Sequence, residues 1–179
     1  LRMAMSQWDV LGLLSPFFIR LKLLMRDVIV ESGPEKLDWA KPISAGIKRD
    51  LEQIVEEMKY LPEVTFKRCT RPESAVGKPT IVCFTDGSRS AVCCAVYLRW
   101  VDKDGLFAGC SLVSSKTKVA PLKVESIPRL ELLSAILGVR LVKNIIVALD
   151  LEGCEVVYVM DSECCLTMIV SDAGALSVY

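Results

Sequence analysis

An apolar run ends in a carboxylate in the stretch Ile81-Val82-Cys83-Phe84-Thr85-Asp86-Gly87-Ser88. The same arrangement returns later in the chain, where Val156-Val157-Tyr158-Val159-Met160 is followed by Asp161. Short apolar runs that end in turn-forming residues are typical of buried β-strands. Between the two runs lies a segment with helical apolar spacing, and Glu131 stands near its start. Two strand ends and one helix are therefore each expected to carry a carboxylate.

The sequence around these runs predicts the element order β-β-β-α-β-α. The expected strands are residues 81–85, 91–100, 106–114 and 155–160, and the expected helices are residues 128–147 and 162–170. The first three strands are joined by short turns, which predicts an antiparallel meander. Ala135 and Gly138 follow Glu131 on the first helix, and such small residues let a helix approach a sheet closely. The expected fold is an α/β sheet that mixes antiparallel and parallel pairing.

Residues 1–76 have a different pattern, with two expected helices. After Ser15-Pro16, apolar residues recur at helical spacing from Phe17 to Val28. A second helix is expected to begin after Ser44 as the N-cap residue and to end at Leu61-Pro62. Residues 67–79 are polar, basic and interrupted by proline and glycine, so we expect a domain boundary near residue 77. The predicted domains are a helical connector, 1–76, and an α/β domain, 77–179.

Composition limits the classes of function. The chain is 52% apolar and 25% charged, with a formal net charge of zero. This excludes a protein that binds nucleic acid through a uniformly basic surface. Any contact with nucleic acid must then be local. The most membrane-like stretch, residues 10–25, is interrupted by Ser15-Pro16 and carries two basic residues, so no membrane span or membrane partner is expected.

The chain has eight cysteines and no histidine. The lack of histidine excludes a Ser-His-Asp triad and a histidine general base within these residues. The pairs Cys93-Cys94 and Cys164-Cys165 are interpreted as free thiols in a reducing compartment, with a thiol-redox module as an alternative. No signal peptide is recognised, so we expect an intracellular protein rather than a secreted one.

Five segments of the second half together resemble the ribonuclease H region of BEL/Pao-type long-terminal-repeat retrotransposon polyproteins. They are Cys83-Phe84-Thr85-Asp86-Gly87-Ser88, residues 91–99, residues 114–123, Ile127-Pro128-Arg129-Leu130-Glu131-Leu132-Leu133 and Met160-Asp161-Ser162. The first half is similar to the segment that joins the reverse transcriptase thumb to that nuclease, in residues 8–16, Leu37-Asp38-Trp39 and Arg68-Cys69. The resemblance covers nearly the whole chain and implies a ribonuclease H-like mixed sheet preceded by a connector.

The resemblance also implies an activity. Asp86, Glu131 and Asp161 would correspond to three of the four acidic ligands of a site that binds two Mg²⁺ ions, with Mn²⁺ as an alternative. The reaction would be hydrolysis of the RNA strand of an RNA–DNA hybrid during reverse transcription. The chain would then be part of a Pol polyprotein, next to its reverse transcriptase domain, in a cytoplasmic element particle or in the nucleus. The fourth ligand is expected beyond Tyr179, and Asp172 is not assigned that role.

Nucleic-acid contact is expected from a basic loop that leads into the Glu131 helix. Its charged residues are Lys116, Lys118, Lys123 and Arg129. Such side chains can bind phosphate oxygens without reading the base sequence, although exposed lysines also serve solubility alone.

A different class of function stays open beside the nuclease. Cys93 stands where the family usually has glycine in the second strand, and other positions also depart from the family pattern. The alternative is a catalytically inactive ribonuclease H-like domain, either degenerate or reused by a host, that acts as a nucleic-acid-binding or scaffold module.

Overall fold

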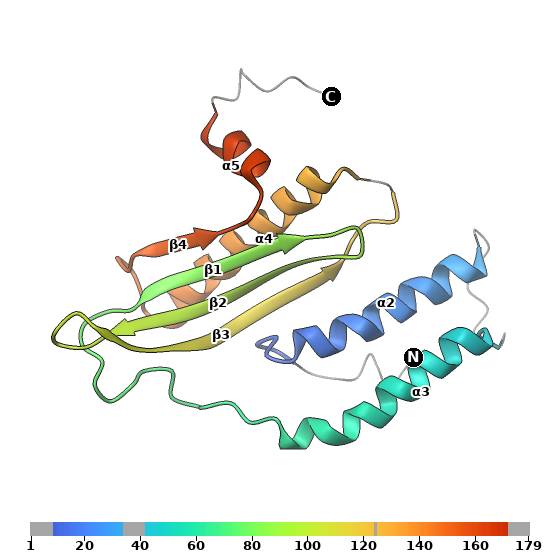
Figure 1. Cartoon of the computed structure of the whole chain (residues 1–179), viewed down its shortest axis with the longest axis horizontal. Coiled ribbons are helices and arrows are strands. Elements are labelled where there is room, and N and C mark those ends of the chain that lie inside the picture. The colour runs from blue at the N-terminus through green and yellow to red at the C-terminus, as the bar shows by residue number, and fades with distance from the viewer. Residues whose placement is uncertain (1–8, 34–41, 124, 172–179) are drawn as a thin grey trace. The chain divides into compact units, whose positions relative to one another are not determined.

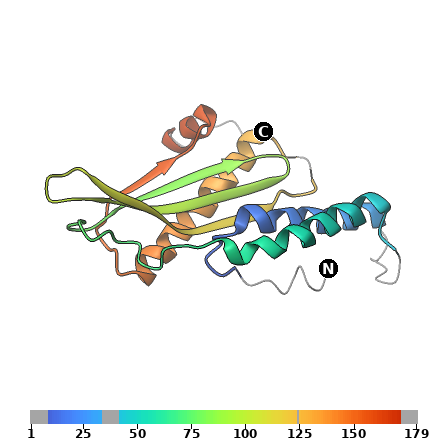
Figure 2. The same cartoon turned by 60° about the horizontal axis from the view of Figure 1, so that its bottom comes forward.

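The structure is a computed structural model that describes residues 9–33, 42–123 and 125–171 (Figures 1 and 2). The chain forms two compact units. The first lies within residues 1–68, except that Leu11–Leu13 belong to the second unit, which continues from Cys69. The first unit is helical and the second contains the sheet.

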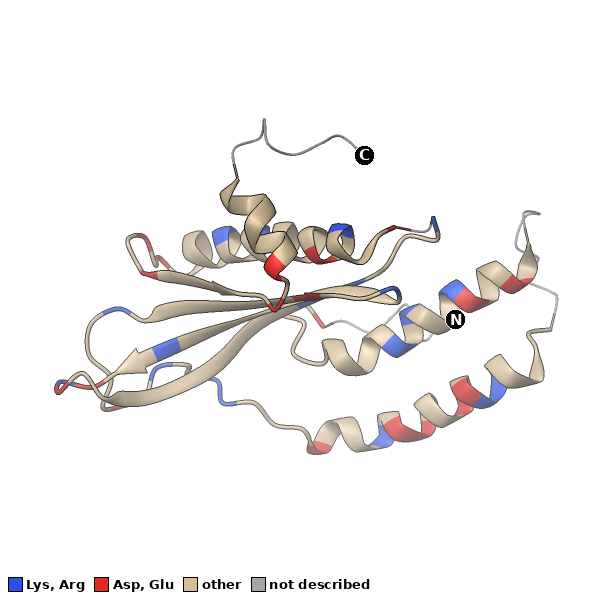
Figure 3. Ribbon diagram, turned by 45° about the horizontal axis from the view of Figure 1, so that its top comes forward, with Lys and Arg blue, Asp and Glu red and all other residues tan. Residues whose placement is uncertain are grey.

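The helical unit consists of α2 (Ser15–Ser32), α3 (Ala45–Glu57) and the 3-10 helix η1 (Met58–Glu63). Ser44 occupies the N-cap position of α3, as expected, but its hydroxyl makes no capping hydrogen bond. Arg20 of α2 pairs with Glu57 of α3, and the Glu57 carboxylate holds the pKa of Arg20 above its usual value. Figure 3 shows acidic and basic residues spread along α3, which is typical of a solvated helix face. None of the described helices has the length and apolar character needed to cross a membrane.

The sheet has four strands in the order β3-β2-β1-β4. They are β1 (Thr80–Gly87), β2 (Ala91–Val101), β3 (Phe107–Val119) and β4 (Val156–Val159). Pairing is antiparallel between β1 and β2 and between β2 and β3, and it is parallel between β1 and β4. The expected meander and the mixed α/β sheet, consistent with a ribonuclease H-like fold, are confirmed.

The third strand is longer than the sequence pattern indicates. It runs to Val119, whereas the prediction ended it at residue 114. Residues 115–118 are polar, but β2 supplies a partner for each residue up to Val119, as in the pairs Ser115 with Ala95 and Val119 with Ala91. Lys116 and Lys118 therefore lie on a strand, and the prediction that placed them in a loop was wrong.

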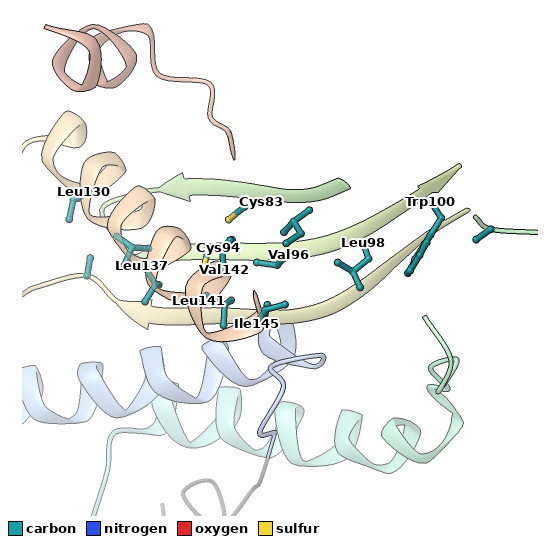
Figure 4. Close-up of a cluster of buried hydrophobic side chains, with 14 residues drawn as sticks. Cys83, Cys94, Val96, Leu98, Trp100, Leu130, Leu137, Leu141, Val142 and Ile145 are labelled. Carbon is teal, nitrogen blue, oxygen red and sulfur yellow. The ribbon is translucent and has the colours of Figure 1, made fainter. Parts of the chain in front are cut away.

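One face of the sheet is covered by α4 (Ile127–Ala148), which lies across β1 and β2 (Figures 2 and 4). The buried side chains form one apolar core between the helix and the sheet. Its members include Ile81, Cys83, Val92, Cys94, Val96 and Leu98 of the strands and Leu130, Leu137, Leu141, Val142 and Ile145 of the helix. Gly138 allows the close approach that was expected, because a Cβ atom there would lie 2.9 Å from Cys83 Sγ.

A short segment from the beginning of the chain lies along the outer edge of β3. The backbone N–H of Ser115 donates a hydrogen bond to the Leu11 carbonyl at 2.8 Å. The hydroxyls of Ser114 and Ser115 donate to the carbonyls of Leu11 and Gly12 at 2.6 and 2.5 Å. These bonds explain why Leu11–Leu13 belong to the same compact unit as the sheet.

Candidate active site

Asp86 and Asp161 lie at the ends of two neighbouring parallel strands. The observed register pairs Phe84 of β1 with Val159 of β4. Asp86 lies two residues beyond Phe84, within β1, and Asp161 lies two residues beyond Val159, past the end of β4. Neighbouring strands are about 4.8 Å apart, so the strand that carries Asp86 and the strand that leads to Asp161 lie side by side. Both side chains are exposed, and Figure 3 shows acidic residues where β4 leads into α5 (Glu163–Val170).

The side chain of Asp86 lies on the sheet face opposite α4. Burial alternates along β1, with Ile81, Cys83 and Thr85 buried against the helix and Phe84 and Asp86 exposed on the other side. The partner of Asp86 on β2 is Cys93. Partial burial raises the pKa of the Cys93 thiol, and the negative charge of Asp86 raises it further. A half-buried thiol therefore lies beside this carboxylate.

Glu131 is brought to the end of β1 by a backbone contact. A Cβ atom built on Gly87 would lie 2.5 Å from the carbonyl carbon of Leu130 and 2.6 Å from the nitrogen of Glu131. No side chain fits in that space, so glycine is required for the strand end to lie against the first turns of α4. Gly87 directly follows Asp86, which makes Glu131 and Asp86 neighbours through the backbone.

Glu131 is also in contact with α5, the helix that follows Asp161. The Cys165 thiol lies 3.6 Å from Glu131 Oε2 and 3.1 Å from the carbonyl oxygen of Pro128. Ser162 is the N-cap residue of α5, as expected, and its hydroxyl accepts a hydrogen bond from the Cys165 N–H at 3.3 Å. The sequence pattern gave no reason to select Cys165 among eight cysteines, because only the packing of α5 on α4 brings it to Glu131.

The three carboxylates are close in the backbone, but their side chains do not converge. Within the described ranges, no three Asp, Glu or Cys side chains lie close enough together to hold a metal ion. Carboxylate oxygen atoms are nevertheless the donors that Mg²⁺ prefers. Asp86, Glu131 and Asp161 thus have the donor chemistry of a magnesium site, but their side chains are not gathered into one within the described residues.

The four basic residues predicted to contact nucleic acid lie on β3, in the connection that follows it and in the first turn of α4. Lys116 and Lys118 pair with Cys94 and Val92, whose side chains are buried toward α4, so both lysines lie on that same face. Lys123 is exposed in the connection from β3 to α4, and Arg129 in the first turn of α4 pairs with Glu125 at 3.3 Å. Arg129 is thus near Glu131, whereas the two strand lysines are on the face opposite the Asp86 side chain.

Comparison with protein families finds a match to this chain. The family model described as the Pao retrotransposon-like RNaseH-like domain matches residues 1–162. The matched range spans the helical unit and the sheet, and it includes Asp86, Glu131 and Asp161. Comparison of the chain with curated proteins found no match. Asp172 lies outside both the matched range and the described residues.

Proposed function

We propose a specific reaction from the premise that the chain belongs to the family of Pao retrotransposon-like RNaseH-like domains. Membership supports a general nuclease-like role. The proposed reaction is Mg²⁺-dependent hydrolysis of the RNA strand of RNA–DNA hybrids during reverse transcription. The observation that carries it is the parallel pairing of β1 with β4, which brings the strand that carries Asp86 beside the strand that leads to Asp161, while Gly87 lets the start of α4 with Glu131 lie against the end of β1.

Each carboxylate has a defined part in this proposal. Asp86, Glu131 and Asp161 would hold the divalent ions, for which Mn²⁺ is a second candidate. When bound, such ions activate a water molecule and stabilise the leaving oxygen in phosphate-ester hydrolysis. The chain has no histidine to act as a general base. The carboxylates would therefore act by binding and positioning the divalent ions. They would not act as general bases in the way that a catalytic histidine does.

The basic residues would hold the substrate by its phosphates. Lys123 lies in the connection that precedes α4, and Arg129 lies in the first turn of that helix, close to Glu131. Lys116 and Lys118 add positive charge along β3. Contacts of this kind fix the position of a nucleic acid and carry no base specificity. Recognition of a hybrid would depend on groove shape and 2′-hydroxyls, so we expect cleavage without sequence preference.

The same family membership suggests where the reaction takes place. We place the chain in a Pol polyprotein beside a reverse transcriptase domain, in a cytoplasmic element particle or in the nucleus. The hybrid made by that polymerase would be the substrate.

A binding or scaffold module without activity is the second candidate. It is favoured by the side chains of the three carboxylates, which are not gathered within the described residues, and by Cys93 beside Asp86. In that case the basic residues would still bind the hybrid while Asp86 would have no role.

Cleavage of a labelled RNA–DNA hybrid by the full chain in Mg²⁺ separates the two candidates. Asp86→Asn is expected to abolish cleavage without weakening hybrid binding. Asp104→Asn is the matched control, because Asp104 is exposed in the turn before β3. Cleavage that survives Asp86→Asn would contradict the nuclease proposal. Absence of cleavage by the unaltered chain, with equal hybrid binding by both forms, would favour the scaffold.

A further inference from the structure

The chain passes from the helical unit to the sheet unit through residues 64–70, which we call the linker (Figure 1). The boundary between the two compact units falls within it, at the peptide bond between Arg68 and Cys69. The linker begins in an extended conformation, with φ −78° and ψ 114° at Val64, and its first six residues are exposed. Residues 65–70 make no backbone hydrogen bond to another described residue. Their peptide groups are therefore accessible to a binding partner.

Two adjacent basic residues, Lys67 and Arg68, lie in the linker, and both side chains are exposed. Neither of them makes an ion pair with another described residue. The sequence contains one other Lys-Arg pair, Lys48-Arg49. That pair lies in α3, where the Lys48 N–H donates a hydrogen bond to the Ser44 carbonyl at 3.0 Å. The same dipeptide therefore occurs once inside a helix and once in irregular, exposed chain.

The chain is fixed to the sheet unit directly after the linker. The Arg71 guanidinium lies over the Trp100 ring, 5.2 Å from its centroid, and donates to the Ala75 carbonyl at 3.1 Å. The Val76 N–H donates to the Val101 carbonyl at 3.0 Å. These contacts all lie within the sheet unit, so they do not depend on the peptide bonds that precede Arg71. A break in the linker would leave this end of the sheet in place.

A segment that binds as an extended strand needs free peptide groups for main-chain hydrogen bonds and accessible side chains to fill pockets. We propose that the linker is a cleavage site for an endopeptidase that binds paired basic side chains in acidic pockets. In the reaction, water hydrolyses the amide bond between Arg68 and Cys69. One product ends in a new carboxylate on Arg68, and the other begins with a new amino group on Cys69. The second product keeps all three carboxylates of the candidate site, and the inference does not depend on whether they bind metal.

The test treats the folded full chain with a subtilisin-like endopeptidase specific for Lys-Arg pairs and identifies the fragments by mass spectrometry. A helix must open before it can enter a protease active site, and cleavage then follows the population of the open form. Peptides of residues 44–53 and 64–73 measure the intrinsic preference of the enzyme for each pair, and the two rates are divided by it. After this correction, we expect cleavage after Arg68 to be at least about 10-fold faster than cleavage after Arg49.

Two matched double variants assign the cut to the linker. Lys67→Gln with Arg68→Gln should abolish it, whereas Lys48→Gln with Arg49→Gln should leave its rate unchanged, and all four side chains are exposed. Equal corrected rates after Arg49 and Arg68 would overturn the inference, and so would a linker that resists the enzyme in the folded chain while its peptide is cut.

Hydrogen exchange of the Val76 amide after the cut tests whether the sheet unit stays intact. Its bond to the Val101 carbonyl lies beyond the linker, so its protection should be unchanged. Loss of that protection would contradict the proposed division, because cleavage would then unfold the end of the sheet.

Discussion

Gly87 sets the distance between the end of β1 and the start of α4. The residue directly follows Asp86, and its missing side chain leaves room for the peptide group between Leu130 and Glu131. The sequence alone gives no reason for a glycine at this position. The need for glycine at position 87 becomes clear only from the structure, because it depends on which helix packs over that strand end.

Gly87→Ala is expected to destabilise the fold and to push Glu131 away from Asp86. The added Cβ atom would lie 2.5 Å from Leu130 carbonyl carbon, and backbone atoms cannot move aside as a side chain could. Overpacking of this kind costs about 1–3 kcal/mol in free energy of unfolding. Denaturant unfolding measures the loss. Gly46→Ala in α3 is the control, because nothing lies within 4 Å of its added methyl group. Equal stabilities of the two variants would contradict the close contact at Gly87.

The buried thiols of Cys83 and Cys94 predict a loss of stability at alkaline pH. Burial raises the pKa of Cys83 from 9.0 to about 12 and that of Cys94 to about 11. Above pH 9 the unfolded chain releases these protons while the folded chain retains them, so the free energy of unfolding falls as pH rises toward the folded values.

The slope is at most about 1.4 kcal/mol per pH unit for each thiol. Denaturant unfolding between pH 8 and pH 10.5 should show the fall in the unaltered chain, and Cys83→Ala should reduce its slope. A slope that is unaffected by Cys83→Ala would mean that this thiol titrates equally in both states.

At the scale of elements, the strands and helices could mostly be predicted, and the polar half of β3 could not. The runs that became β1, β2, β4 and α4 are apolar with clear periodicity, so local pattern and final structure agree. Residues 115–119 are Ser, Lys, Thr, Lys and Val, and nothing local favours a strand there. They are extended because β2 offers hydrogen-bond partners on one side and Leu11 offers one on the other. Pairing of this kind depends on distant residues.

The segment at Leu11–Leu13 is expected to stabilise the edge of the sheet. Ser115 is buried, and its hydroxyl is a donor to the Gly12 carbonyl. Ser115→Ala removes that donor and should lower the free energy of unfolding by about 1–2 kcal/mol. Ser111→Ala on the same strand is the matched control. Hydrogen exchange of the Ser115 amide, which donates to Leu11, gives a local measurement, and unchanged protection after deletion of residues 1–13 would contradict this contact.

The two vicinal cysteine pairs differ in exposure because of the elements that carry them. Successive residues of a strand point to opposite faces, so Cys94 is buried and Cys93 is half-buried on the other side. On α5, Cys164 is exposed and Cys165 is buried. Native alkylation followed by mass spectrometry should therefore modify Cys164 much faster than Cys165 or Cys94. Fast reaction of both members of a pair would revive the thiol-redox alternative.

For the whole molecule, the order of the carboxylates is visible in the sequence, whereas the placement of their side chains is not. The pattern of two strand ends and one helix already selected Asp86, Asp161 and Glu131. The side-by-side placement of β1 and β4 follows from parallel pairing between residues more than seventy positions apart. The placement of Lys116 and Lys118 could not be predicted from local sequence either, because their partners on β2 decide which face of the sheet they occupy.

Hydrolysis of an RNA–DNA hybrid by single and double variants tests the shared metal site most directly. If Asp86 and Asp161 hold the same ions, Asp86→Asn and Asp161→Asn should each lower the cleavage rate at least about 100-fold, and the double variant should be no slower than either one. Circular dichroism checks that each variant is folded. If the two losses multiply in the double variant, or if either single variant cleaves at the unaltered rate, the two carboxylates do not share a catalytic ion.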